Sequence, residues 1–147
     1  MKSLPKDNQP SIKAEEHSTV PVFAYELLRD VLIPELLGSD TPEISYWAGK
    51  YIARRFPLLS IDEAAEFFKE AGWGHLYIVR EKKNEFLLEL SGDIIERRLT
   101  MASEPCFRLE AGFLAEQVQS MKEAAAETFE EIHKKELKVL FRIQWDA

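Results

Sequence analysis

The spacing of apolar residues changes at Gly72, and this change constrains the fold of the 147-residue chain more than any other feature of its sequence. Before Gly72 the apolar residues recur every three or four positions, which predicts amphipathic helices. Across residues 73–79 they alternate, and a polar stretch at 81–84 leads to a second alternating run at 86–90. Two alternating runs joined by a short polar segment predict an antiparallel hairpin.

Two of the helices predicted before Gly72 have recognisable boundaries. The first is expected to end or kink near Ile33, because Pro34 has no backbone N–H to donate. The third opens with a capping box, in which the side chains of Ser60 and Glu63 satisfy the first free amides. The apolar residues at helical spacing in the first helix are Phe23, Ala24, Leu27, Leu28 and Val31.

The helix predicted between these two carries two stripes. The larger stripe is predicted to be buried and consists of Ile44, Trp47, Ala48, Tyr51 and Ile52. The second stripe contains only small residues at steps of four, namely Ser45, Gly49 and Ala53. A glycine inside a helix costs up to about 1 kcal/mol relative to alanine. Close approach of another backbone offsets that cost, and the partner is either a neighbouring helix or a second subunit.

The chain after the hairpin predicts two more helices and a final strand. A short amphipathic helix is expected across 93–100, and a long helix from Cys106 to about Ala124, with tight packing at Gly112. Residues 139–145 alternate as a strand does. The segment 127–133 is ambiguous and is interpreted as a strand, because the last strand needs a hairpin partner.

These elements predict an α+β fold, with helices packed on one face of a small antiparallel sheet. Residues 1–18 hold two prolines, mixed charges and few large apolar side chains, so they are expected to be a disordered tail. A single domain is therefore predicted to span residues 19–147.

The charge balance and the apolar runs exclude several classes of protein. The chain has 26 acidic and 19 basic side chains and a net charge of −7, which argues against a general nucleic-acid surface. The pairs Lys82-Lys83 and Arg97-Arg98 are interpreted as solvated faces. No apolar run has the length of a signal peptide or of a membrane span, so no membrane insertion and a cytoplasmic location are expected.

The sequence contains no recognisable catalytic motif, and we expect no enzymatic activity, no cofactor and no metal. Metalloprotease, nucleophile-elbow, phosphate-loop and Cys-x-x-Cys signatures are absent from the sequence. Gly72-Trp73-Gly74 is interpreted as a helix stop that leads into a strand. The acidic residues expected on polar helix faces are Asp62, Glu63, Glu66, Glu70, Glu110 and Glu116.

Two residues leave alternatives open. His75 is expected on the same strand face as Trp73 and Tyr77, as a partly buried, hydrogen-bonded residue, a haem ligand or a proton-transfer group. Cys106 is expected at the start of the long helix, whose dipole favours a thiolate. It is a buried structural thiol, a modified or ligand-facing thiol, or a nucleophile. A single cysteine excludes an internal disulfide and the multi-cysteine zinc patterns.

Several segments together resemble the YslB-like family of Gram-positive bacteria, a domain of unknown function, over residues 22–146. They are Phe23–Arg29, Ser45–Lys50, Ala53–Pro57, Glu70–Gly74, Glu104–Gln117 and Gln144–Asp146. That family is more remotely similar to the ligand-binding fold of haem nitric-oxide sensors, Golgi transport-particle subunits and 4-vinyl-reductase-type domains. The resemblance implies a helical layer over a four-stranded antiparallel sheet, often dimeric, with an apolar cavity.

The resemblance transfers few functional residues. Cys106 matches the first zinc ligand of the sensor relatives, but His133 and Phe141 stand at or near the other ligand positions. Zinc is therefore not expected. The acylated cysteine of the transport subunits is not assigned to Cys106, and the proximal histidine of the haem sensors has no match.

The leading hypothesis is a non-enzymatic, homodimeric binding or interaction domain with an apolar pocket between sheet and helices. The alternatives are a haem or tetrapyrrole sensor with His75 as ligand, and thiol chemistry at Cys106. The candidate pocket residues are Trp47, Tyr51, Trp73, His75, Tyr77, Cys106 and Phe113. The candidate interface residues are Ser45, Gly49 and Ala53.

Overall fold

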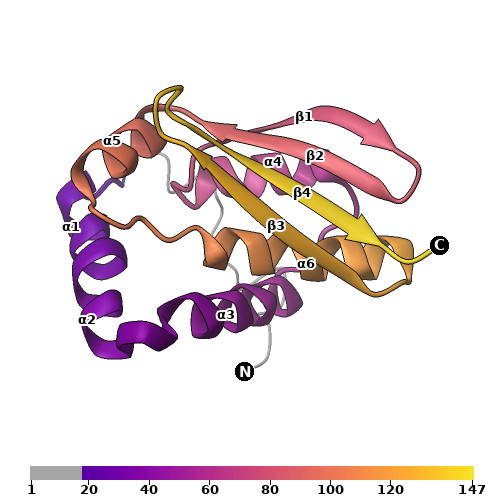
Figure 1. Ribbon diagram of the computed structural model, residues 1–147, viewed down its shortest axis with the longest axis horizontal. Helices are drawn as coiled ribbons and strands as arrows, with labels where there is room; N and C mark the ends of the chain where they lie inside the picture. Colours follow the sequence, from indigo (N-terminus) through magenta and orange to yellow (C-terminus); the bar gives the residue numbers. More distant parts are fainter. Residues whose placement is uncertain (1–17) are drawn as a thin grey trace.

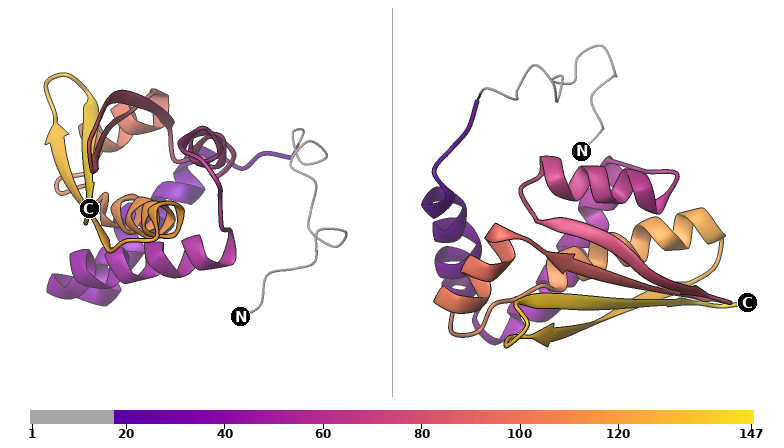
Figure 2. Two further views of the ribbon diagram at one scale, coloured as in Figure 1. Left: turned by 90° about the vertical axis from the view of Figure 1, so that its right-hand side faces the viewer. Right: turned by 90° about the horizontal axis from the view of Figure 1, so that it is seen from above.

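The computed structural model describes residues 18–147 as helices gathered on one face of a four-stranded sheet (Figures 1 and 2). The α+β prediction is confirmed. The tail predicted for residues 1–18 lies almost entirely outside the described residues. No helix among residues 18–147 is both long and apolar enough to cross a membrane.

The N-terminal part is a helical arm that changes type several times. It consists of α1 (Val22–Glu26), the π-helix η2 (Leu27–Leu32), α2 (Ile33–Leu37) and the short 3-10 turn η3 (Gly38–Asp40). The amide of Ile33 donates to the carbonyl of Leu28, five residues back, so the backbone is π-helical just before Pro34. The helix therefore changes type at Ile33 rather than ending there. It ends at Gly38, which adopts φ +57°.

Two further helices follow the arm. The first, α3 (Thr41–Arg55), turns back beneath the molecule in Figure 1. The second, α4 (Ile61–Glu70), begins as predicted, because the Ser60 hydroxyl accepts a hydrogen bond from the Glu63 amide. Gly72, with φ +75°, follows the end of α4.

The sheet has the order β1-β2-β4-β3, and all neighbouring strands are antiparallel. The strands are β1 (His75–Lys82), β2 (Glu85–Ser91), β3 (Ala126–His133) and β4 (Lys138–Trp145). The predicted hairpin is β1–β2, with an irregularity between Ile78 and Arg80. The predicted strand at 127–133 is confirmed as β3. Between the hairpins lie α5 (Asp93–Met101) and α6 (Arg108–Lys122).

Helix α6 lies between the sheet and α3, and it is buried on nearly all sides. Gly49 of α3 and Gly112 of α6 allow the two backbones to touch. A Cβ on Gly49 would collide with the Leu109 carbonyl, and a Cβ on Gly112 would collide with the Tyr46 carbonyl. The small-residue stripe therefore packs against a neighbouring helix of the same chain, and Gly49 and Ala53 are buried there. This arrangement corrects the assignment of these residues to a subunit interface.

The larger stripe of α3 does not lie in the core. Trp47 is 70% exposed, Tyr51 45% and Ile44 42%. The prediction that these residues are buried is wrong for the single chain. Helix α3 instead turns its small residues inward, because only they allow the close contact with α6.

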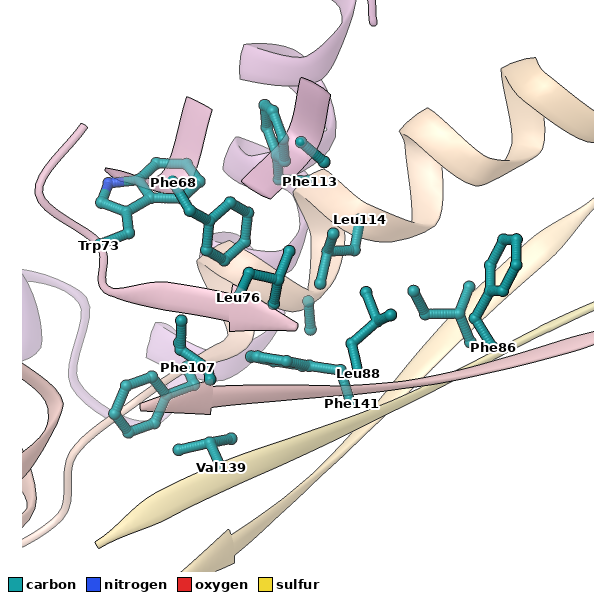
Figure 3. Close-up of a cluster of buried hydrophobic side chains, with 14 of the residues drawn as sticks. Phe68, Trp73, Leu76, Phe86, Leu88, Phe107, Phe113, Leu114, Val139 and Phe141 are labelled. Carbon is teal, nitrogen blue, oxygen red and sulfur yellow. The ribbon is translucent and has the colours of Figure 1, made fainter. Parts of the chain in front are cut away.

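The core between α4, α6 and the sheet is rich in aromatic side chains (Figure 3). Trp73 is 7% exposed and packs edge-on against Phe68 and Phe113, with ring centroids 5.0 and 5.3 Å apart. Such edge-to-face pairs are favoured by the quadrupoles of the rings. Trp73 and Phe113 are thus part of a packed core and not of an open pocket.

Candidate functional site

Four charged side chains meet where η2, α5 and the first turn of α6 come together. Arg29 and Asp30 come from η2, Arg98 from α5 and Glu110 from α6. Both arginines contact Glu110: Arg29 Nη2 lies 2.9 Å from Oε1, and Arg98 Nη1 lies 3.4 Å from Oε2. Arg98 Nη2 also lies 3.0 Å from Asp30 Oδ1. We call these four residues the ion cluster.

The ion cluster is largely shielded from solvent, and its formal charges sum to zero. Arg98 is 1% exposed and Glu110 is fully buried. The sequence-based interpretation of Arg98 and Glu110 as solvated residues is therefore wrong. Buried charges persist when each one is paired and hydrogen-bonded. A carboxylate in the first turn of α6 also lies at the favourable end of the helix dipole.

The ion cluster holds the chain segment that leads into α6. The carbonyl oxygen of Cys106 accepts hydrogen bonds from Arg98 Nη2 at 3.0 Å and from Arg29 Nη2 at 3.4 Å. The guanidinium of Arg98 lies 4.4 Å from the centre of the Phe107 ring, a cation–π distance. Helix α6 begins only at Arg108, so Cys106 precedes the helix instead of forming its first turn.

The electrostatics of the ion cluster favour the charged form of Arg29. Burial acts to lower the pKa of Arg29, but the Glu110 carboxylate, Tyr25 and Asp30 outweigh burial and raise that pKa above its ordinary value. Burial raises the pKa of Tyr25, whose hydroxyl accepts a hydrogen bond from Arg29 Nη1 at 2.7 Å. Arg29 therefore stays charged and Tyr25 stays neutral.

The N-terminal arm presents its charged side to the interior. Glu26 is 7% exposed and forms an ion pair with Arg97 of α5, in addition to the contacts of Arg29 and Asp30. The opposite side of the arm carries exposed large apolar side chains. They are Phe23, Leu27, Leu28, Val31, Leu32 and Leu36. An ordinary surface helix has the opposite arrangement, with apolar residues facing the interior and charged residues facing solvent.

A cavity of about 150 Å³, partly open to solvent, lies beside the ion cluster between the arm, α3 and the start of α6. Its walls are mostly apolar, and Arg29 forms the wall that it shares with the ion cluster. The Thr41 hydroxyl in the lining already donates to the Gly38 carbonyl at 2.7 Å. The complete lining is Arg29, Ile33, Leu37, Thr41, Ile44, Ser45, Ala48, Cys106 and Leu109. None of these residues belongs to a strand of the sheet. The prediction of a pocket between sheet and helices is therefore wrong for this cavity.

The structure separates the candidate pocket residues of the sequence analysis. Of the seven candidates, Cys106 alone lines the cavity beside the ion cluster. Trp47 and Tyr51 line a shallow groove of about 590 Å³ on the outer face of α3. Tyr77 is 55% exposed on β1.

His75 is exposed on β1 and lines a second open groove. This groove has a volume of about 630 Å³ and lies between the start of the arm, the end of α4 and the start of α5. The His75 ring packs over Gly92, where a Cβ would lie 2.6 Å from Cδ2. Trp73, expected on the same strand face as His75, lies instead in the core.

The family model described as "Protein of unknown function (DUF2507)" matches residues 22–144. The chain belongs to the DUF2507 family. The uncharacterized protein YslB of Bacillus subtilis is 50% identical over 124 residues, which cover 84% of either chain. The uncharacterized protein MJ1642 of Methanocaldococcus jannaschii is 26% identical over 102 residues, 69% of this chain and 62% of its own length. The resemblance to the YslB-like family is thus confirmed.

Two solved structures share the fold of this DUF2507 chain. One is a vinyl-4-reductase family protein from M. jannaschii, with a TM-score of 0.61, 22% identity, and coverage of 92% of this chain and 87% of its own. The other is a variant Fe(II) unliganded H-NOX protein from K. algicida, with a TM-score of 0.56, 12% identity, and coverage of 99% and 82%. The remote fold relationship expected from the sequence is confirmed.

The cavity beside the ion cluster does not fit a haem. An axial ligand requires a side chain such as histidine that faces the iron. Among the described residues that line the cavity there is no histidine and Cys106 is the one side chain of a haem-ligating type, but a volume of about 150 Å³ matches a single small ring rather than a tetrapyrrole. His75 borders a different and open groove. Over residues 18–147 there is also no group of three or more His, Cys, Asp or Glu placed to hold a metal ion.

The ion cluster was not predicted from the sequence, and neither were most of the residues that line the cavity. One signal was present: Glu26, Arg29 and Asp30 recur at helical spacing on the first predicted helix, opposite its apolar residues. A second was Glu110, which precedes a run of small and apolar residues in the long helix.

Proposed function

We propose that this chain is a non-enzymatic binding domain whose ligand is neutral, apolar and about as large as a benzene ring. The observation that carries the proposal is the mostly apolar, partly open cavity beside the ion cluster, with a volume of about 150 Å³. A dry apolar cavity of roughly this volume in another protein binds benzene or xenon. The shared fold of the two solved structures gives further support for ligand binding.

The charge of the ligand follows from the surroundings of Arg29. Its guanidinium already contacts both oxygens of Glu110, at 2.9 and 3.1 Å, and the Tyr25 hydroxyl at 2.7 Å. An anionic ligand would have to compete with Glu110 for this cation inside the protein. A neutral molecule avoids that cost, and the Ser45 hydroxyl and the Cys106 thiol are the remaining polar groups for it.

The absence of enzymatic activity is part of the proposal. General acid–base catalysis needs a titratable side chain within hydrogen-bonding reach of the substrate. The described lining has no histidine and no carboxylate, its one charged group is held by the ion cluster, and its Cys106 thiol therefore has no general base in the lining. We further propose that the domain acts in the cytoplasm and self-associates.

Titration of the full chain with benzene, followed by methyl NMR, tests the ligand proposal. We expect shifts that saturate at the methyl groups of Ile33, Leu37, Ile44 and Leu109. Ser45→Leu, which places three more carbon atoms in the cavity, should weaken binding at least about tenfold, corresponding to roughly 1.4 kcal/mol. Ser120→Leu makes the same change on an exposed site of α6 and should leave binding unchanged.

The single thiol gives a second readout of the same cavity. Because Cys106 lines the cavity, benzene should slow its alkylation in the wild-type chain and have no such effect in Ser45→Leu. Shifts spread over the surface without saturation, together with an alkylation rate that benzene leaves unchanged, would overturn the proposal.

A further inference from the structure

The outer face of α3 carries a stripe of exposed side chains that runs the length of the helix. Glu43, Trp47, Tyr51 and Arg54 recur at steps of three and four, so they lie on one side. All four are exposed, and Trp47 at the centre of the stripe is 70% exposed. The opposite side of α3 is occupied by Gly49 and Ala53 against α6. We call the four residues, together with Ile44, the α3 face.

From this arrangement we infer that the α3 face binds the α3 face of a second copy of the same chain, with the two helices antiparallel around a two-fold axis near Trp47. This inference goes beyond ligand binding. It rests on the self-association part of the proposed function and names the surface that association uses.

The arm and the α3 face expose a large amount of apolar surface. Helix α2 leads into α3 and contacts it, and the arm adds six exposed large apolar side chains to the three of the α3 face. Taking roughly 200 Å² for a large side chain, the α3 face alone exposes on the order of 300 Å² of apolar surface. The nine large apolar residues of these two rows expose on the order of 900 Å², so an interface through the α3 face also takes in part of the arm. A stable interface takes about 800 Å² from each partner, whereas the largest apolar patch on an ordinary monomer is about 300–600 Å². The nine residues are Phe23, Leu27, Leu28, Val31, Leu32, Leu36, Ile44, Trp47 and Tyr51.

The α3 face is also complementary in charge to itself. Glu43 lies near the N-terminal end of α3 and Arg54 near its C-terminal end, with Trp47 between them. In an antiparallel pair of helices the N-terminal end of one copy lies beside the C-terminal end of the other. Glu43 of each copy therefore meets Arg54 of its partner, and the contact forms twice.

Other occupants explain the surface less well. Residues 1–17 contain only Met1, Leu4 and Ile12 as large apolar residues, too few to cover nine. A membrane surface rich in anionic lipid would repel a chain with a net charge of −7. A second copy supplies the same apolar rows and the matching charges.

Sedimentation equilibrium of the full chain tests the inference. We expect a dimer to predominate at roughly 10 µM. Trp47→Glu should raise the dissociation constant about 100-fold or more, because a two-fold interface loses a central aromatic residue from both copies. Tyr77→Glu changes an exposed aromatic residue on β1 and should leave the constant unchanged.

A charge swap tests the antiparallel orientation. Arg54 also pairs with Glu116 of its own chain, with 3.4 Å between Nε and Oε2. We therefore compare Arg54→Glu with the double variant Glu43→Arg/Arg54→Glu, both of which lack the Arg54–Glu116 pair. Arg54→Glu should weaken the dimer, and the double variant should restore most of the loss.

Each outcome bears on a separate statement. A monomer at concentrations well above 10 µM would overturn both self-association and the α3 face. A dimer that Trp47→Glu leaves intact would overturn the α3 face and keep self-association. If Trp47→Glu weakens the dimer but the double variant does not recover the loss caused by Arg54→Glu, the antiparallel arrangement is overturned.

Discussion

The guanidinium of Arg98 and the carboxylate of Glu110 lie 3.4 Å apart, and both side chains are almost completely removed from solvent. The contact joins α5 to the first turn of α6. Arg29 and Asp30 complete the charge balance from η2, so the ion cluster fastens the N-terminal arm to the body of the fold. The same arginines hold the Cys106 carbonyl at the edge of the cavity.

Removal of the central carboxylate is expected to be costly. Glu110→Gln removes the carboxylate that Arg29 contacts in the ion cluster and leaves Arg98 with Asp30 alone, and breaking a buried ion pair costs about 3–5 kcal/mol. Urea denaturation should show this loss in the free energy of unfolding. Glu116→Gln breaks the Arg54–Glu116 pair, which is more exposed than the ion cluster, and should cost no more than about 1 kcal/mol. Equal losses in the two variants would show that the ion cluster contributes no more than a surface pair.

The contact between α3 and α6 predicts a destabilising glycine-to-alanine change. Helix propensity alone would favour Gly49→Ala by up to about 1 kcal/mol. The added Cβ, however, collides with the Leu109 carbonyl and lies 2.7 Å from the Phe113 amide nitrogen. We expect a net loss of about 1–3 kcal/mol in the free energy of unfolding. Ser120→Ala on the exposed side of α6 should be neutral or slightly stabilising, and a stabilising Gly49→Ala would contradict the close contact.

Local patterns predicted the elements of the fold well. The capping residue Ser60 and the alternation of residues 73–90 act within short stretches, so the sequence determines the start of α4 and the β1–β2 hairpin. The strand at 127–133 required a different argument, that β4 needs a partner. That argument succeeded because an unpaired strand leaves backbone groups without hydrogen bonds.

Periodicity alone could not predict which side of α3 faces the interior of the chain. A stripe of large apolar residues indicates which side is covered, but not whether the cover belongs to the same chain. In this structure the small residue Gly49 turned inward, because only close backbone contact with α6 compensates for a glycine there. Trp47, which a periodicity argument places in the core, was left on the surface.

The ion cluster depends on contacts between distant parts of the sequence. Glu110 meets Arg29 across 81 positions and Arg98 across 12. A charged residue is almost never fully buried unless it is paired, so its default interpretation is a solvated one. The cavity shares this origin, since its lining also comes from distant parts of the sequence, namely the arm, α3 and the segment from Cys106 to Leu109.

The raised pKa of Tyr25 predicts a loss of stability in alkali. In the unfolded chain tyrosine ionises near pH 10. The folded protein keeps its proton to a higher pH, because burial raises the pKa of Tyr25. Above about pH 10 the unfolded state therefore binds fewer protons than the folded state, and the free energy of unfolding falls as pH rises. Below pH 10 this contribution is fully present.

Tyr25→Phe should reduce the slope of stability against pH in alkali, by less than one proton per molecule. Urea denaturation at several pH values between about 9 and 11 measures that slope, which lies around the ordinary pKa of tyrosine. Tyr77→Phe alters an exposed hydroxyl on β1 and serves as the matched control. Identical slopes for wild type and Tyr25→Phe would show that Tyr25 ionises in the folded state as it does in the unfolded state.

The different burial of two tryptophans predicts a fluorescence signal for association. Trp47 is 70% exposed in the single chain, whereas Trp73 is 7% exposed. If the α3 face binds a second copy, Trp47 becomes shielded at high concentration and accessible to acrylamide on dilution. Quenching of the wild type should therefore increase as the chain is diluted through its dissociation constant. Trp47→Phe should remove this dependence, because Trp73 stays in the core and Trp145, at the end of β4, lies outside the α3 face. Quenching of the wild type that is independent of concentration would place Trp47 outside any interface.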